Sequence, residues 1–330
     1  MNIAINGFGR IGRSAFKICL DKGLKVVAIN NTSGDPATHA HLLKHDSNYG
    51  NYERKVEATT DSLIVDGKKT LVLSERDPAK LPWKKLGVDI VLECTGHFTD
   101  AASAKAHLIA GAKRVIISAP AKDNSPTFVL GVNKSSGKHE VISNASCTTN
   151  CITPVIDVLE NAFGIKKAMM TTVHAYTADQ NLQDGTHKDL RRARNAADNI
   201  VPTTTGAAKT TIKIITSLQN KFDGLSIRVP VKVVSLSDIT AVLKKPVTVE
   251  QVNDAFKKAS KNPRYSGILG VTEEELVSSD FIKDSRSAIV DLPLTMVVDG
   301  DLVKVVAWYD NEWGYSCRLV ELAIEVGKKL

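Results

Sequence analysis

The sequence predicts a two-domain α/β protein, and three observations support that prediction. The first 30 residues have the pattern of a strand, a glycine-rich turn, a helix and a second strand. Beyond Cys147 the predicted strands become longer, which is typical of an antiparallel sheet rather than of further alternating units. At 330 residues the chain is also long for a single hydrophobic core, so two domains are expected.

The N-terminal part alternates strands and helices in the way that a parallel sheet requires. Ile11, Ala15 and Ile18 fall on one face of the first predicted helix. A helical pattern spans 100–110, and Asp66-Gly67 between two apolar runs indicates a hairpin. Buried strands are predicted where apolar and β-branched residues run together, at 24–29, 89–94 and 114–118.

Gly7, Gly9 and Gly12 stand directly after the first predicted strand and open the first helix. In that position the spacing G-x-G-x-x-G lets the backbone approach a pyrophosphate, whose charge is held by N–H groups at the helix N-terminus. The alternative is a merely tight strand–helix turn. The pattern predicts a Rossmann-type dinucleotide-binding domain over residues 1–147. The position that usually carries Asp or Glu for the adenosine ribose is Asn31.

The C-terminal domain is predicted over residues 148–311 as an α+β catalytic domain built on a mostly antiparallel sheet. Its first helix contains Pro154 past the first turn, where a proline is expected to kink or strain it. The last helix, at about 312–330, is expected to return to the first domain. Strands are predicted at 225–234, 237–243, 287–298 and 302–309, and helices at 205–217 and 249–259.

Cys147 leads into that first helix, and His174 ends the apolar strand pattern that follows. A helix N-terminus and a nearby histidine both favour a thiolate, so a lowered pKa is expected for Cys147. His174 is then a candidate general base, and a structural histidine at a strand end is the alternative. Cys151, one helical turn later, is expected to face the core. The spacing of these residues does not suit the common structural zinc sites, so no metal is predicted.

A long polar segment from 176 to 202 carries Lys188, Arg191, Arg192 and Arg194. Loops of this length inside a compact domain are usually functional. The alternatives are a solvated charge run and a nucleic-acid patch, although the aromatic residues that commonly accompany such patches are missing nearby. The formal net charge of +7 favours anionic ligands through a weak general field.

The composition is ordinary for a globular enzyme, with 43% hydrophobic and 24% charged residues. The N-terminus has neither a basic segment nor a long apolar region, so no signal peptide is expected. No apolar run approaches the ~18 residues of a membrane span. Five scattered cysteines without a Cys-x-x-Cys pair do not indicate a disulfide framework. A cytoplasmic location is expected.

Five stretches together resemble phosphorylating glyceraldehyde-3-phosphate dehydrogenase, from the first strand to the last helix. The resemblance implies oxidation of D-glyceraldehyde 3-phosphate, with inorganic phosphate and NAD(P)+, to 1,3-bisphosphoglycerate through a cysteine thiohemiacetal and thioester. It places the reaction in glycolysis, gluconeogenesis or carbon fixation, and it implies a homotetramer that requires neither membrane nor nucleic acid. The stretches are 5–13 (INGFGRIGR), 74–78 (SERDP), 145–151 (ASCTTNC), 202–209 (PTTTGAAK) and 308–316 (WYDNEWGYS).

The same resemblance implies roles for individual residues. Cys147 would attack the aldehyde and His174 would take the proton. Thr177 and Arg228 would hold the phosphate of the substrate, and one loop arginine would serve the same site, Arg192 being preferred to Arg191 and Arg194. The attacking phosphate would be held by Ser146, Thr148, Thr205 and Gly206. Contacts with the cofactor are implied for Gly7, Gly9, Arg10, Ile11, Asn31, Arg76, Ser118 and Asn311.

Two departures from the family pattern leave the choice between NAD and NADP open. Asn31 stands where strictly NAD-dependent members have an acidic residue, and Gly185-Thr186 stands where many have a bulky apolar pair. Three other functions are possible: an erythrose-4-phosphate dehydrogenase, a catalytically silent binding protein and a cysteine hydrolase. The silent binding protein would leave the thiol–imidazole pair without a role, and the hydrolase would leave the nucleotide motif without one.

Overall fold

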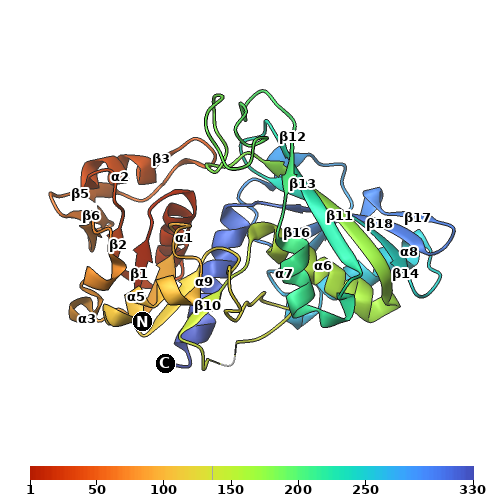
Figure 1. Ribbon diagram of the computed structural model, residues 1–330, viewed down its shortest axis with the longest axis horizontal. Helices are drawn as coiled ribbons and strands as arrows, with labels where there is room; N and C mark the ends of the chain where they lie inside the picture. The colour runs from red at the N-terminus through yellow and green to blue at the C-terminus, as the bar shows by residue number, and fades with distance from the viewer. Residues whose placement is uncertain (136) are drawn as a thin grey trace. The chain divides into compact units, whose positions relative to one another are not determined.

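The computed structural model describes residues 1–135 and 137–330 (Figure 1). The chain forms two compact units. The first contains Met1–Phe128, Lys134–Ala145 and Ser316–Leu330, and the second contains Val129–Asn133 and Ser146–Tyr315. Residues 129–133 therefore pack with the second unit, although they lie within the range predicted for the first domain.

The first unit is built on an eight-stranded sheet with the order β10-β9-β8-β1-β2-β7-β6-β5. Six of these strands are parallel: β1 (Asn2–Asn6), β2 (Lys25–Asn30), β7 (Lys68–Leu73), β8 (Ile90–Glu93), β9 (Arg114–Ile117) and β10 (Val141–Ser143). The antiparallel edge strands are β5 (Val56–Ala58) and β6 (Ser62–Val65), and β3 (His45–Asp46) pairs separately with β4 (Gly50–Asn51). The predicted hairpin is confirmed, because Asp66 and Gly67 adopt positive φ between β6 and β7.

Short and long helices cover this sheet. Trp83 and Ala104 share a buried cluster with Val91 and Val115 of the sheet. The predicted 100–110 helix is present as two pieces. The helices are α1 (Arg10–Asp21), α2 (Pro36–Lys44), α3 (Trp83–Leu86), α4 (Ala101–Ala104), α5 (Ala106–Ile109) and α9 (Trp313–Gly327), with a 3₁₀ turn η1 (Pro78–Lys80).

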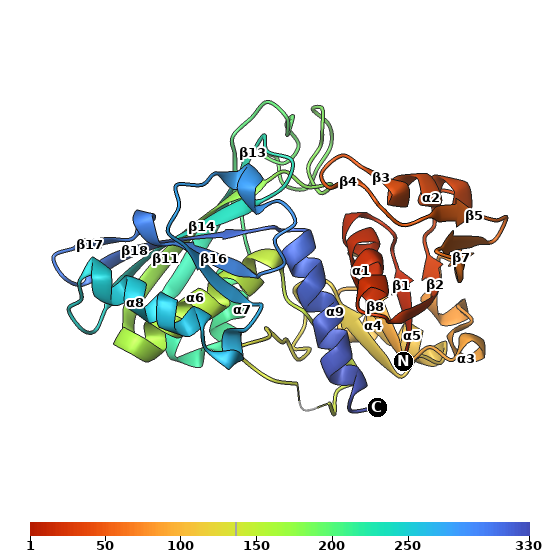
Figure 2. The ribbon, with the colours of Figure 1, turned by 180° about the vertical axis from the view of Figure 1, so that it is seen from behind.

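Helix α9 completes the first unit although it is the last element of the chain. It lies beside α1 (Figures 1 and 2), and Lys22 at the end of α1 contacts Glu321 of α9 at 3.2 Å. Its buried face consists of Leu319, Val320, Leu322, Ala323 and Val326. Burial of five such side chains stabilises the first unit by several kcal/mol, at about 25 cal/mol per Å² of apolar surface.

The second unit has the order β12-β13-β11-β14-β18-β16-β15, with β17 paired to β18. The prediction of a mostly antiparallel sheet is confirmed, since only the pairs β11–β13 and β15–β16 are parallel among those of the described chain. The strands are β11 (Ile165–Ala175), β12 (Val201–Thr204), β13 (Phe222–Val229), β14 (Ser235–Leu243), β15 (Leu269–Thr272), β16 (Ala288–Asp291), β17 (Met296–Val298) and β18 (Leu302–Tyr309).

Helices α6 (Cys147–Phe163), α7 (Ala207–Ile214) and α8 (Val249–Ser260) lie on one face of this sheet (Figure 2). Their apolar side chains and those of the strands form one core, to which Cys151 contributes, as predicted. Helix α6 runs through Pro154 without ending there. The predicted strand at 287–298 is instead two strands separated by the 3₁₀ turn η5 (Leu292–Leu294), because Pro293 has no N–H for the ladder.

The loop between β11 and β12, residues 176–200, contains no helix or strand. The loop starts at Tyr176, directly after the last residue of β11, and His174 lies in the final two residues of that strand. The remaining 3₁₀ turns in the second unit are η2 (Thr216–Leu218), η3 (Pro263–Tyr265) and η4 (Ser278–Phe281). In the part of the chain that the structure describes, no helix is both long and apolar enough to cross a membrane.

Candidate active site

Cys147 is the first residue of α6, at a sharp turn from extended chain into helix. Ala145 adopts φ 56°, in the left-handed region that side chains other than glycine seldom enter. Ser146 then caps the helix, its Oγ accepting a hydrogen bond from the Thr149 N–H at 3.1 Å. The thiol therefore stands at the positive end of a 17-residue helix.

His174 faces that thiol from the end of β11. Its Nε2 lies 3.5 Å from Cys147 Sγ, and its Nδ1 lies 2.6 Å from the carbonyl oxygen of Ala175. A carbonyl only accepts hydrogen bonds, so this short contact favours the tautomer with the proton on Nδ1 over the one in which Nδ1 would accept from Arg228 Nη1 at the longer distance of 3.0 Å. Nε2 is consequently an acceptor directed at the thiol, which is the arrangement that a general base requires.

Burial controls the charge of this pair. It raises the pKa of the Cys147 thiol, although Arg228 and hydrogen bonds involving Thr148 act in the opposite direction. Burial, with Arg228 acting in the same sense, lowers the pKa of His174 to about 3. The expectation of a lowered pKa for Cys147 is therefore wrong for the chain alone, because desolvation outweighs the helix N-terminus. The pair is a neutral thiol and a neutral imidazole.

Arg228 lies beside His174 because β11 and β13 run parallel and pair these two residues in register. Its Nη1 donates to the Ala175 carbonyl at 3.2 Å and to Thr177 Oγ1 at 3.4 Å, and lies 3.0 Å from His174 Nδ1. Burial lowers the pKa of Arg228. Among the described residues no carboxylate forms an ion pair with it, which is the environment of a receptor for an anion.

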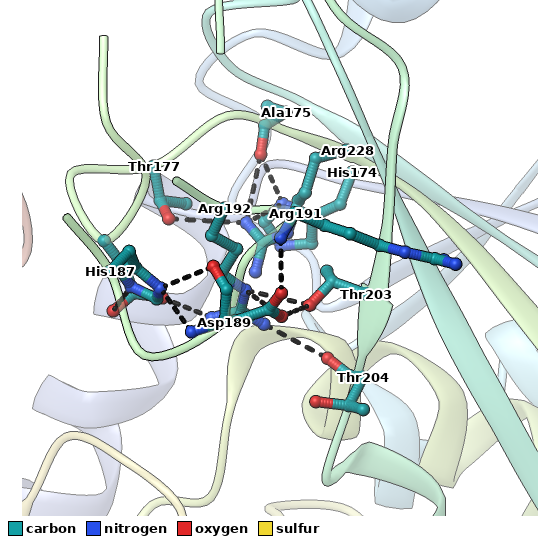
Figure 3. Close-up of polar contacts among 11 residues, drawn as sticks. His174, Ala175, Thr177, His187, Asp189, Arg191, Arg192, Thr203, Thr204 and Arg228 are labelled. Atoms are coloured by element: carbon teal, nitrogen blue, oxygen red, sulfur yellow. Dashed lines mark hydrogen bonds and ion pairs between the residues drawn. The ribbon is translucent and has the colours of Figure 1, made fainter. Parts of the chain in front are cut away.

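Arg192 reaches the same region from the long loop (Figure 3). Its Nε donates to Thr203 Oγ1 at 2.9 Å and its Nη2 to the Thr204 carbonyl at 3.1 Å, at the end of β12. The other two loop arginines point elsewhere: Arg194 is exposed and pairs with Asp184, while Arg191 is exposed and contacts the Pro202 carbonyl. Arg192 is the best buried of the three.

Hydroxyl groups surround the thiol. Thr148 Oγ1 lies 2.9 Å from the Tyr309 hydroxyl, which also contacts Thr172 Oγ1 at 2.8 Å, and the Tyr309 ring packs edge-on against His174. Sequence reasoning missed Tyr309 as a member of this site, although the motif WYDNEWGYS contains it. Thr205 Oγ1 accepts from the Ala207 N–H at 3.2 Å, and Gly206 caps α7.

Asn311 is connected to the strand that carries His174 through the hydroxyl group of Ser235. Ser235 Oγ accepts from the Ala175 N–H at 3.1 Å and lies 3.1 Å from Asn311 Oδ1. The Asn311 side chain is buried. The structure thus brings Cys147, His174, Arg228 and Thr177 together with Arg192, Thr148 and Asn311 within the second unit.

The glycine turn of the first unit fits a dinucleotide. A Cβ at Gly7 would lie 2.7 Å from the Cys94 carbonyl carbon, and one at Gly12 would lie 2.0 Å from the Gly7 oxygen. Both glycines are therefore required for close packing of strand and helix. Gly9, in contrast, faces open space within 4 Å and has no side chain to cover the N-terminus of α1. An anion can approach those N–H groups, two of which belong to Arg10 and Ile11.

A cavity of about 410 Å³ lies at this edge of the sheet. Arg76 and Asn31 line it with Gly7 and Gly9, whereas Ser118 is absent from its lining. Asn31 Oδ1 accepts from the Phe8 N–H at 3.0 Å, and its Nδ2 donates to the Ser33 carbonyl at 2.6 Å. The Arg10 side chain turns to Asp46 at 2.7 Å. The full lining is Asn6, Gly7, Gly9, Asn30, Asn31, Thr32, Glu75, Arg76, Cys94, Thr95, His97 and Phe98.

A buried polar network supports the floor of that cavity. Glu93 accepts from Asn6 Nδ2 at 2.6 Å, from His107 at 3.0 Å and from the Thr95 N–H at 2.8 Å. His107 in turn accepts from the indole N–H of Trp83 at 3.0 Å. Donors on every side let a carboxylate remain buried, and they hold the ends of β1 and β8 in fixed positions.

Comparisons with known proteins agree with this architecture. Residues 1–101 match the family described as the NAD binding domain of glyceraldehyde 3-phosphate dehydrogenase, and residues 146–311 match its C-terminal domain. The chain is 53% identical to the glyceraldehyde-3-phosphate dehydrogenase of Streptomyces coelicolor. It is 51% identical both to glyceraldehyde-3-phosphate dehydrogenase 2 of Bacillus subtilis and to the enzyme of Geobacillus stearothermophilus.

Each of these matches covers 100% of this chain and 98% or 99% of the relative. The names do not favour the erythrose-4-phosphate alternative. No group of three or more His, Cys, Asp and Glu residues suited to a metal ion occurs among the described residues. With both domain families matched and about half of all positions identical, the chain belongs to the glyceraldehyde-3-phosphate dehydrogenase family.

Proposed function

We propose that this chain converts D-glyceraldehyde 3-phosphate, inorganic phosphate and NAD+ to 1,3-bisphosphoglycerate and NADH. The supporting observation is the contact between the Cys147 thiol and a histidine nitrogen that the Ala175 carbonyl has left unprotonated. This pair stands beside Arg228, which has no carboxylate partner among the described residues. A nucleophile, a base and an anion receptor thus meet at one point.

The thiol and imidazole carry the covalent steps. Cys147 Sγ forms a bond to the aldehyde carbon while its proton moves to His174 Nε2, so the neutral pair becomes a thiohemiacetal oxyanion beside an imidazolium. His174 gives that proton to the oxyanion, which completes the hydroxyl group, and takes it back as the intermediate is oxidised to a thioester. NAD, when bound, supplies the acceptor for the hydride. Attack by inorganic phosphate on the thioester breaks the C–S bond and returns the proton to Cys147.

The anionic groups require separate receptors. We assign the phosphate of the substrate to Arg228 and Thr177, and Arg192 to the same anionic region, since a charge-assisted bond to a guanidinium is the strongest contact available there. The attacking phosphate is assigned to hydroxyl and amide donors. These are Ser146, Thr148, Thr205 and Gly206.

Cofactor binding is assigned to the glycine turn and the cavity beside it. The fit of Gly7, Gly9 and the first amides of α1, at Arg10 and Ile11, to a pyrophosphate supports this assignment. Arg76 and Asn31 line the cavity. The roles of Ser118 and Asn311, the second as the residue that orients the nicotinamide amide, rest on the family resemblance.

A homotetramer in the cytoplasm remains a prediction from the same resemblance. Exposed apolar side chains on the sheet of the second unit support an interface with further copies. Met169, Met296 and Val298 are each more than half exposed.

Steady-state oxidation of glyceraldehyde 3-phosphate tests the proposed reaction. We expect formation of NADH to require inorganic phosphate and arsenate to replace it. Turnover that is independent of phosphate, with release of the free acid, would refute the phosphorylating reaction.

A further inference from the structure

Two arginines of the second unit, Arg228 and Arg192, differ in whether a carboxylate neutralises the guanidinium. Arg228 bonds a carbonyl and a hydroxyl, and its Nε is buried without a hydrogen-bond partner. Arg192 has all three of its nitrogens engaged. Besides Thr203 and Thr204, its Nη1 forms an ion pair with Asp179. Its Nε also lies 3.6 Å from Asp189 Oδ2, so this guanidinium already carries two carboxylates, of which Asp179 alone contacts Nη1.

The contacts of Arg192 differ in how easily they break. Thr203 Oγ1 is itself held by Asp189 Oδ2 at 2.6 Å, and the Thr204 carbonyl belongs to β12 (Figure 3). Those acceptors are parts of a fixed framework. Asp179 instead lies in the loop with half of its side chain exposed. An ion pair to such a group contributes about 0–1 kcal/mol, which a stronger anion can overcome.

We propose that Asp179 is a specificity-determining residue that occupies Arg192 until a phosphate dianion displaces it. The proposal rests on the function proposed above, in which Arg192 serves the anionic site. A phosphate group carries about −1.5 to −2 charges at pH 7, against −1 for a carboxylate. Asp179 therefore yields to phosphate dianions and excludes monoanions such as acetate.

The loop also provides a partner for the displaced carboxylate. His187 Nε2 lies 3.8 Å from Asp179 Oδ1, and His187 is anchored through Nδ1 by the Asp189 N–H at 2.9 Å. Asp179 can thus leave Arg192 without leaving its polar surroundings. Among the described residues Arg228 forms no ion pair with a carboxylate, although the charge of Asp179 acts on it at longer range. An anion can therefore bind Arg228 without displacing a carboxylate side chain.

The test is the substitution Asp179→Asn, which preserves the shape of the side chain and removes its charge. Protection of Cys147 from iodoacetamide is measured against increasing inorganic phosphate, without cofactor, and against increasing acetate. We expect the half-protecting phosphate concentration to fall about 2- to 5-fold, and acetate to gain protection that it lacks in the wild type. The KM for glyceraldehyde 3-phosphate, whose phosphate group Arg192 serves in the proposed function, should fall as well, while kcat changes less than twofold.

Asp184→Asn is the matched control, because Asp184 lies in the same loop and pairs with Arg194 rather than with Arg192. It makes the same change of net charge and should shift phosphate protection less than twofold. In an Arg192→Gln background, Asp179→Asn should have no effect on protection.

Weaker phosphate binding in Asp179→Asn, or an equal gain in Asp184→Asn, overturns the proposal. A gain in affinity cannot come from misfolding. Should NADH formation prove independent of phosphate, the proposed reaction fails, whereas the protection assay still reports on Asp179.

Discussion

Replacing His174 by asparagine isolates the contribution of the base. The substitution removes the acceptor that lies 3.5 Å from Cys147 Sγ. Burial keeps the pKa of that thiol above its usual value. At the ordinary pKa of about 8.5, roughly 3% of a thiol is ionised at pH 7, so the variant has less thiolate than that. Without a base, attack on the aldehyde depends on this ionised fraction, whereas in the wild type His174 accepts the proton as the C–S bond forms. The difference lowers the rate at least ~30-fold.

Loss of proton acceptance in the oxidation step adds to that deficit. Together they predict a fall in kcat of roughly 10²–10⁴, which is about 3–5 kcal/mol of transition-state stabilisation. Initial rates of NADH formation at saturating substrate measure it. His139→Asn, at an exposed position of the first unit, is the control and should keep full activity. A folded His174→Asn protein, with unchanged affinity for NAD and less than a fivefold loss of kcat, would refute the reasoning.

Three further substitutions or modifications test the site. Alkylation at a stoichiometry of one should abolish activity and map by mass spectrometry to Cys147; modification of the buried Cys151 or Cys317 instead would contradict its role as nucleophile. Arg228→Ala should reduce kcat/KM for glyceraldehyde 3-phosphate far more than for unphosphorylated glyceraldehyde, and equal losses would count against a phosphate receptor. Because the Arg228 cation lowers the pKa of Cys147, the same variant should shift the pH profile of alkylation to higher pH and slow the reaction at pH 7. Asn31 carries no charge that would repel a 2′-phosphate, so we expect the enzyme to accept NADP in addition to NAD. The substitution Asn31→Asp should shift the ratio of kcat/KM for the two cofactors towards NAD. A wild-type preference for NAD above about a thousandfold, roughly 4 kcal/mol, would exclude this.

Local patterns predicted much of the architecture. The glycine turn, the hairpin at Asp66-Gly67 and the antiparallel character of the second sheet each depend on neighbouring residues, and each is confirmed. The strand predicted at 287–298 was wrong because a single proline interrupts an otherwise suitable run. The proximity of Cys147 and His174 was anticipated only because a helix and the next strand pack together.

Properties that depend on burial and on contacts between distant residues cannot be predicted from local sequence patterns. The pKa of Cys147 was expected to fall, but desolvation by the folded core raises it. The pairing of Asp179 with Arg192 joins two positions of a loop without regular structure, so no periodicity reveals it. The same holds for Tyr309, whose hydroxyl contacts Thr148, the residue next to the thiol, from a strand more than 150 residues away.

The return of α9 to the first unit has a consequence for how the protein is made. Residues 146–315 must be synthesised before the helix that supplies the buried Leu319 and Leu322 exists. At about 5–20 residues per second, the ribosome needs roughly 10–35 s for that stretch. During this interval the nascent first unit has an uncovered apolar face, and a fragment ending near residue 145 would keep it permanently. Synthesis of the first unit therefore begins before that of the second and ends after it. A chain released before residue 316 would lack α9 and expose the apolar face that α9 covers, which makes it a substrate for chaperones and proteases.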